Sequence, residues 1–291
     1  MTDFYGCDWE WDPEKDLYFN QISYPLKKFA SLSEGLNSLY RIDWKNYVEI
    51  LQEDLDAQIQ WTKDYCCIAD RHVAGFTENS LRIRGYEEWY MDTVIDPAGV
   101  EALLEIILED KIRYWDAVID WALEHGYQDQ IDVISECDDL GSQSSTIIDP
   151  ETIRKMVIPG FRKLFAHLKT RLPGAKTFLH SCGAIRELIP DLIDAGLDIL
   201  NPVQYTAAGM ELKGLKKDFG KDLVFWGGGI DTQTTLNNGS PQEVRDMVKK
   251  NLDIMAPGGG FVFAPVHNMQ DDVPAENFWA MWETLQEYGK Y

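Results

Sequence analysis

Short apolar runs alternate with longer amphipathic segments along most of the chain. The short runs lie near residues 66, 131, 177, 198, 223 and 261. They are apolar at consecutive positions, as expected for strands that are covered on both faces. The segments between them carry apolar residues at helical spacing. This alternation predicts an α/β fold with a parallel sheet and right-handed crossovers.

Several expected helices have clear start signals. Three begin with an acid or serine cap followed by proline, at Asp96-Pro97, Asp149-Pro150 and Ser240-Pro241. They are expected to end near residues 124, 171 and 255, and the others to cover residues 44–64, 78–90, 184–195, 211–219 and 274–288. The first strand is expected as a buried run at residues 65–69, which would place Cys66 and Cys67 in the core.

The first 43 residues show no hydrophobic period. They are rich in aromatic side chains and are interrupted by Pro13 and Pro25. Disordered tails are rarely so aromatic. We therefore expect an ordered, irregular arm at residues 1–43, followed by a single domain at residues 44–291.

The charge of the chain narrows the classes of partner. The formal net charge is −22, so the surface would repel a nucleic-acid backbone. It could attract a partner with a basic patch, although a low isoelectric point is also common in proteins without one. No apolar run is long enough to span a membrane, and the first residues do not resemble a signal peptide. These features predict no nucleic acid and no membrane.

The cysteines indicate a reducing compartment. There are five, an odd number, and their spacing shows no disulfide framework. In a chain of this length that pattern is typical of a cytoplasmic protein.

The stretch from Lys176 to Gly183 carries the clearest candidate chemistry. His180 and Cys182 lie two apart at the end of an expected strand, so an extended chain would point both to the same side. Imidazole and thiolate are preferred ligands of zinc, and strand ends are where parallel α/β folds place chemistry. A hydrogen-bonded histidine beside a small buried thiol would give the same pattern, and the spacing alone does not separate the two.

A second histidine follows the last expected strand. His267 would lie on the same rim as His180 if the sheet is parallel. It could complete a three-ligand zinc site with an open fourth position, or it could cap the next helix.

Polar loops follow two other strands. Glu136 and Asp139 lie in one of them, where they could act in acid–base chemistry, ligate a metal or orient His180, or belong to a solvated acidic loop. Gln143 and Gln233 could bind a substrate carboxylate or amide. The remaining histidines are expected to be surface or structural residues: His72, His125 and His167.

Two glycine triplets lie in the second half of the chain. Residues 227–229 lack the spacing of a dinucleotide-binding loop, so they are expected to turn the backbone sharply or bring it close to a ligand. Residues 258–260 precede a strand and are expected to form a tight turn from helix to strand.

Taken together, five stretches resemble the uroporphyrinogen decarboxylase superfamily. They are Asp138 to Gln143, His180 to Gly183, Asp198 to Gln204, Trp226 to Gln233, and His267 to Asn277. The resemblance is detailed from about residue 130 onward and looser before it. It implies a TIM-type (β/α)8 barrel as the single domain. A barrel lacking the first βα unit would account for six strands instead of eight.

The resemblance is greatest to the zinc-dependent methyltransferases that act with corrinoid proteins. His180 and Cys182 match their His-x-Cys zinc ligands, and their later cysteine would fall near His267. The resemblance therefore implies Zn²⁺ on His180, Cys182 and His267, with His267, Glu136 or Asp139 in catalysis. It further implies substrate contacts from Gln143, Gln204, Asp231 and Gln233.

The function implied is zinc-assisted methyl transfer between a small methylated substrate and a corrinoid carried by a partner protein. The alternative within the family is decarboxylation of a tetrapyrrole of the uroporphyrinogen type. A porphyrinogen carries many carboxylates and calls for arginines, whereas Arg41 is the only arginine in the first 60 residues. A truncated pseudo-enzyme or corrinoid-protein-binding subunit is the third interpretation, and a homodimer is left open.

Overall fold

The computed structural model describes residues 1–14 and 18–290, which form two compact units. The first comprises Met1–Asp138 and Ile148–Thr177, and the second Asp139–Ile147 and Phe178–Tyr291. Each unit combines parallel strands with covering helices. The α/β class predicted from the alternation is confirmed, and the strand order β3-β4-β5-β6-β7-β8 follows the chain. The division into an arm at 1–43 and a domain at 44–291 stays a prediction.

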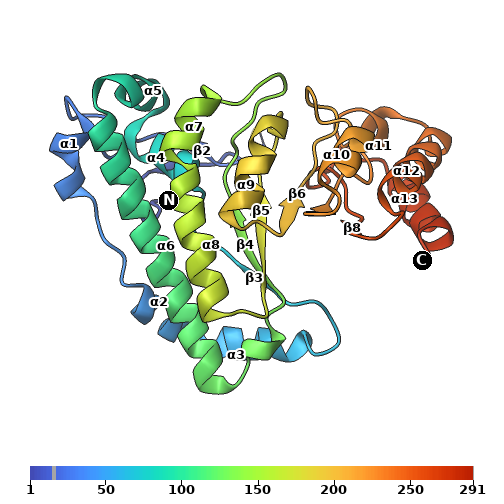
Figure 1. The fold of residues 1–291 in the computed structure, drawn as a ribbon, viewed down its shortest axis with the longest axis horizontal. Helices are drawn as coiled ribbons and strands as arrows, with labels where there is room; N and C mark the ends of the chain where they lie inside the picture. The colour runs from blue at the N-terminus through green and yellow to red at the C-terminus, as the bar shows by residue number, and fades with distance from the viewer. Residues whose placement is uncertain (15–17, 291) are drawn as a thin grey trace. The chain divides into compact units, whose positions relative to one another are not determined.

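The first unit is built around two strands and one long helix. β3 (Ile68–Asp70) pairs in parallel with β4 (Val133–Cys137), and the Lys176 amide at the start of β5 donates to the Asp132 carbonyl. Helix α6 (Pro97–His125) packs against α8, and Figure 1 shows the two side by side. The other helices and the small antiparallel pair of this unit are β1 (Trp9–Glu10), β2 (Asn20–Gln21), α1 (Leu32–Gly35), α2 (Trp44–Ile50), α3 (Gln52–Trp61), α4 (Phe76–Arg84), α5 (Tyr86–Ile95), α7 (Pro150–Met156) and α8 (Ile158–Arg171).

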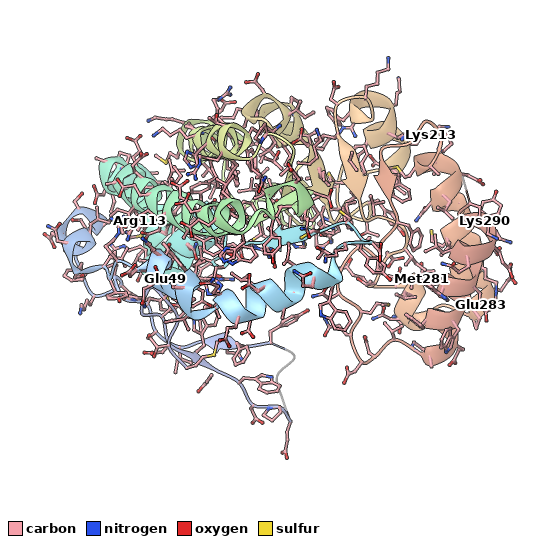
Figure 2. The ribbon with its side chains drawn as sticks, turned by 90° about the horizontal axis from the view of Figure 1, so that it is seen from below. Glu49, Arg113, Lys213, Met281, Glu283 and Lys290 are labelled. Carbon is pink, nitrogen blue, oxygen red and sulfur yellow. The ribbon has the colours of Figure 1, made fainter. Side chains whose placement is uncertain are left out.

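The second unit holds the remaining strands. β5 (Lys176–His180) pairs with β6 (Ile199–Asn201), β6 with β7 (Val224–Trp226), and β7 with β8 (Phe261–Val262), all in parallel. The helices are α9 (Ile189–Ala195), α10 (Leu212–Phe219), α11 (Thr235–Asn238), α12 (Pro241–Met255) and α13 (Ala275–Tyr288). Helix α13 is amphipathic, because Met281 is buried while Glu283 is exposed (Figure 2). It packs on α12.

The cap signals in the sequence correspond to observed helix ends. The Asp96 side chain accepts from the Gly99 amide at the start of α6, and Gly126 ends that helix in the left-handed conformation. Ser240 and Glu243 form a reciprocal capping box at the start of α12. Both helices therefore begin and end close to where the sequence predicted.

Three expected helices are interrupted. The helix expected at 78–90 is split at Gly85, which has φ +102° and separates α4 from α5. The helix expected at 150–171 is split at Val157, two residues before Pro159, whose nitrogen cannot donate a helical hydrogen bond. The helix expected at 44–64 is split at Leu51 into α2 and α3.

The expected strand at residues 65–69 is partly wrong. β3 begins only at Ile68, because residues 62–65 form a turn in which the Tyr65 amide donates to the Thr62 carbonyl. Tyr65 is 77% exposed and Cys66 is exposed, so Cys66 is not a core residue, whereas Cys67 is buried. Across the described residues none of the five cysteines forms a disulfide, and no described helix is long and apolar enough to cross a membrane.

Candidate metal centre

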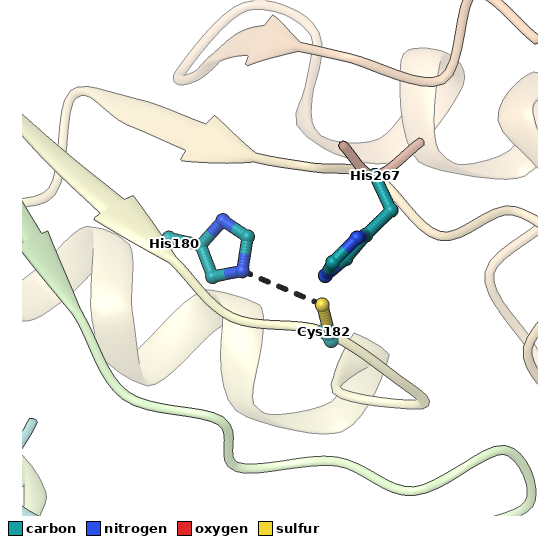
Figure 3. Close-up of side chains that lie close together, drawn as sticks. All are labelled: His180, Cys182 and His267. Atoms are coloured by element: carbon teal, nitrogen blue, oxygen red, sulfur yellow. Dashed lines mark hydrogen bonds between the residues drawn. The ribbon is translucent and has the colours of Figure 1, made fainter. Parts of the chain in front are cut away.

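The second unit gathers three potential metal ligands at the ends of two strands. His180 is the last residue of β5, Cys182 follows it by two residues, and His267 lies in the loop after β8. Figure 3 shows the three side chains turned toward one another. The chain after β8 is held by a parallel bridge between Ile230 and Pro265 and by the Val266 amide, which donates to the Ile230 carbonyl. These contacts fix the backbone next to His267.

The distances suit a metal with nitrogen and sulfur ligands. His180 Nε2 lies 3.4 Å from Cys182 Sγ, and one ligand atom from each of the three residues falls within 4.8 Å of the others. Tetrahedral zinc at ordinary bond lengths would separate a bound nitrogen and sulfur by about 3.6 Å. The His180–Cys182 pair already meets that separation. The side chain of His267, the third residue, is exposed.

The loop after β4 supports the cysteine. Asp139 Oδ1 accepts a hydrogen bond of 2.7 Å from the Cys182 amide and lies 3.9 Å from His180 Nε2. The Leu140 amide donates to Ser181 Oγ, and Ser181 is buried. Asp139 therefore touches both members of the His-x-Cys pair, while the serine between them faces the interior.

Two glycines allow this close approach. Gly183 has φ +86°, and a β-carbon there would lie 2.3 Å from the carbonyl carbon of Gly141. A β-carbon on Gly141 would in turn lie 2.7 Å from the Ala184 nitrogen. The Ala184 amide donates to the Ser142 carbonyl across this contact. The glycine after the His-x-Cys pair is therefore required by backbone contact.

The four predicted substrate-binding residues fall into two groups. Gln143 and Gln233 have exposed side chains. Gln204 is buried, and its Oε1 accepts from the Gly183 amide. It follows Val203, which has φ +59°, a conformation rare for a β-branched residue. Gln204 therefore holds the Cys182–Gly183 turn.

Asp231 is also engaged by the protein. It is buried, and its carboxylate accepts from the backbone amides of Gln233, Thr234 and Thr235. Burial alone would raise its pKa, but the hydrogen bonds from the two threonines outweigh it and lower the pKa. The carboxylate thus stays ionised and shapes the loop before α11.

The glycine triplet before Asp231 behaves as expected. Gly227 and Gly228 have φ +115° and +78°, and a β-carbon on Gly227 would lie 2.1 Å from the Pro202 carbonyl oxygen. The triplet at 258–260 also has positive φ throughout, as a tight turn into β8 requires.

Glu136 lies in the first unit, where all its described contacts are structural. Its Oε2 accepts from Lys111 Nζ at 2.6 Å and its Oε1 from Trp115 Nε1 at 2.6 Å. Both Glu136 and Lys111 are 1% exposed. These contacts give no support to the predicted catalytic role of Glu136, which stays a prediction.

One residue of the centre was not singled out from the sequence. His180 Nδ1 lies 2.6 Å from Oδ1 of Asn201, the last residue of β6. The signal would have been the strand register, since His180 and Asn201 are paired neighbours in the parallel ladder. A sequence does not state that register.

Comparison with known proteins agrees with the predicted resemblance. A family model for uroporphyrinogen decarboxylase (URO-D) matches residues 72–288. The chain is 25% identical over 213 residues to the methylated-thiol–coenzyme M methyltransferase of Methanosarcina mazei, covering 70% of this chain and 48% of that protein. It is 27% identical over 192 residues to the methylcobamide:CoM methyltransferase MtaA of Methanosarcina barkeri, covering 65% of this chain and 49% of that protein.

A solved structure shares the fold. A methyltransferase from Methanosarcina mazei superposes with a TM-score of 0.68 at 19% identity, covering 98% of this chain and 76% of that one. The chain spans about half the length of the curated relatives it matches. Because the family model matches most of the chain, this protein belongs to the uroporphyrinogen decarboxylase (URO-D) family.

Proposed function

We propose that this protein is a zinc-assisted methyltransferase that moves a methyl group between a small methylated substrate and a corrinoid held by a partner protein. The observation that carries the proposal is the convergence of ligand atoms from His180, Cys182 and His267 within 4.8 Å. Two relatives named as methyltransferases support it, and the name of one includes methylcobamide.

The donor set defines what the centre would do. Zinc bound there would act as a Lewis acid toward the heteroatom that gives or receives the methyl group. His180 and His267 would bind as neutral imidazoles and Cys182 as a thiolate. One thiolate neutralises only one of the two positive charges of zinc, so the open position favours an anionic heteroatom. Asp139, next to both His180 and Cys182, would accept or position the proton that this heteroatom loses.

The surrounding side chains suggest two different roles, contact with the substrate and support of the loops. Gln143 and Gln233 are exposed and would contact the substrate directly. Gln204 and Asp231 are buried and bonded to backbone amides, so they would shape the loops that carry the centre. The five cysteines, free in the described residues, are typical of a reducing compartment, which supports a cytoplasmic location.

The decarboxylase alternative receives less support from the second unit. Its sequence contains two arginines, Arg186 and Arg245. Both are engaged in ion pairs, with Asp218 and Glu283 respectively. A substrate with many carboxylates would need arginines that face the site.

Metal analysis of the purified protein tests the proposal. The parent should carry about one zinc per chain, and the His180→Ala/Cys182→Ala variant close to none. A matched control is His125→Ala/Cys66→Ala, which removes a histidine and an exposed cysteine of the first unit and should keep the zinc. Equal and negligible zinc in the parent and the His180→Ala/Cys182→Ala variant would remove the mechanism. It would also favour the decarboxylase or the pseudo-enzyme.

A further inference from the structure

Asn201 is placed to control the direction in which His180 binds. It ends β6 beside the end of β5, with His180 and Asn201 as paired residues of the parallel ladder. Its backbone carbonyl accepts from the Ser181 amide at 2.8 Å. Paired residues of neighbouring strands project their side chains to the same face of a sheet. The Asn201 amide therefore meets the His180 ring at its Nδ1 edge, on the side away from Cys182.

The orientation of the Asn201 amide follows from its second partner. Its Nδ2 donates a 2.8 Å hydrogen bond to the Trp226 carbonyl at the end of β7. A carbonyl oxygen can only accept, so the amide nitrogen must face Trp226 and the amide oxygen must face His180. The opposite orientation would set two acceptor oxygens against each other.

This orientation determines the protonation of the ring. Asn201 Oδ1 can only accept, so the 2.6 Å contact requires that His180 Nδ1 carries the proton. In a neutral imidazole the other nitrogen, Nε2, then has a free lone pair. Nε2 is the atom that faces Cys182 Sγ at 3.4 Å (Figure 3). The tautomer needed for metal binding through Nε2 is thus the one that Asn201 selects.

Two other buried asparagines of the second unit show the difference from a structural role. Asn251 donates to the carbonyls of Gly228 and Gly229, and Asn277 to those of Leu236 and Gly239. Both bridge backbone segments. Asn201 bridges one carbonyl in the same way, but its oxygen is directed at a candidate ligand.

We infer that Asn201 is a positioning residue for the proposed metal centre. It holds His180 as the Nδ1–H tautomer and fixes the ring, so that the Nε2 lone pair points toward Cys182 and His267. The inference rests on the proposed function for its metal, but the tautomer exists without one.

Zinc affinity, the His180 tautomer and stability to urea are measured on three variants to test it. Asn201→Leu keeps the size of the side chain and removes both hydrogen bonds. Asn201→Asp keeps an acceptor for Nδ1–H and loses the donor to Trp226. Asn277→Ala is the control, since it removes two buried bonds to carbonyls in the same unit. Zinc affinity is measured by competition with a chromophoric chelator, and the His180 tautomer by long-range ¹⁵N–¹H NMR of the metal-free protein, with His180→Gln for assignment.

The expected pattern separates positioning from general support. Asn201→Leu should bind zinc about 10- to 100-fold more weakly, as other changes to outer partners of metal ligands do. In this variant the NMR signals of His180 should show a mixture of the two tautomers and no longer the Nδ1–H tautomer alone. Asn201→Asp should recover most of the affinity although it is less stable to urea. Asn277→Ala should lose stability but keep the parent affinity and tautomer.

Several outcomes would overturn the inference. One is parent affinity and an unchanged tautomer in Asn201→Leu, and another is an equal loss of affinity in Asn277→Ala. A proton on Nε2 in the metal-free parent would contradict it directly. A parent that binds no zinc but shows the Nδ1–H tautomer, lost in Asn201→Leu, would refute the proposed function and leave the positioning role supported.

Discussion

The carboxyl ends of β4 and β5 look alike in sequence and differ in what their side chains do. Both strand ends carry a polar side chain, Glu136 or His180, with a cysteine within two residues of it. In the first unit, Glu136 is bound on both oxygens and Asp138 accepts two backbone amides. In the second unit, His180 and Cys182 present a nitrogen and a sulfur to each other and to His267.

The contrast shows that residue type at a strand end is a weak guide to chemistry. Both oxygens of the buried Glu136 carboxylate already accept hydrogen bonds from side chains of the first unit, so its charge is held by the protein. His180 is partly exposed and its Nδ1 is bonded to Asn201, so its Nε2 remains available to a ligand. The variants below, in order of expected effect, test this contrast.

The largest effect is expected from breaking the buried pair of the first unit. Lys111→Met leaves the Glu136 carboxylate buried without its cation, which should lower the free energy of unfolding by about 3–5 kcal/mol. Lys163→Met is the control, because the Lys163–Glu105 pair is exposed and is expected to contribute less than about 1 kcal/mol. Urea denaturation measures both. Equal losses in the two variants would show that the Lys111–Glu136 pair is not the buried structural element described here.

Asp138 should make the stability of the first unit depend on pH. Complete burial, together with the nearby Glu78, raises the pKa of Asp138 to about 7. The folded state then holds the proton more tightly than the unfolded state. Stability is therefore greatest below the ordinary pKa near 4 and falls as the pH rises to about 7, by at most about 4 kcal/mol. Asp138→Asn should flatten that slope in urea denaturation series, and an unchanged slope would contradict the assignment.

Adding one methyl group at Gly183 should disturb the candidate centre. Gly183→Ala would place a β-carbon in contact with the Gly141 backbone at positive φ, which should cost about 2 kcal/mol and weaken zinc binding by moving Cys182. Gly174→Ala is the matched control, because a β-carbon there meets nothing within 4 Å. Urea denaturation and zinc titration of the two variants should separate them. If Gly183→Ala keeps the parent zinc affinity, the turn does not position the cysteine.

Asp231 should show the opposite pH dependence to Asp138, with a smaller effect. Its pKa is lowered by hydrogen bonds, so it contributes stability above the ordinary pKa of an aspartate, and that contribution is lost as the pH falls. Asp231→Asn should cost about 1 kcal/mol at neutral pH and reduce the loss of stability in acid. Thermal melts from neutral to acidic pH would reveal this contribution of the Asp231 carboxylate. If Asp231→Asn lost as much stability in acid as the parent, the contribution would be ruled out.

The sequence predicted the parts of the fold that depend on local signals. Asp96 and Gly126 delimit α6, and Ser240 with Glu243 begins α12, because caps act within a few residues of the helix end. The split between α4 and α5 was missed. The helical pattern continues on both sides of Gly85, and only its observed φ shows that the chain turns there.

Part of the candidate centre could also be predicted from the sequence. The strand-end argument indicated that His180 and His267 would lie on one rim, and the structure brings them near each other. The contribution of Asn201 depends on the register between β5 and β6, which is set by packing across the sheet. The contacts of Glu136 could not be predicted from the sequence either, because Lys111 lies on a helix 25 residues earlier in the chain.

X-ray absorption at the zinc edge is the most direct test of the central claim that His180, Cys182 and His267 form one metal centre. The account predicts one sulfur at about 2.3 Å, with nitrogen or oxygen atoms at about 2.0–2.1 Å that include two imidazoles. Cys182→Ser should remove the sulfur and His267→Ala one imidazole. Bound zinc with no sulfur neighbour, or a spectrum unchanged in both variants, would contradict the account.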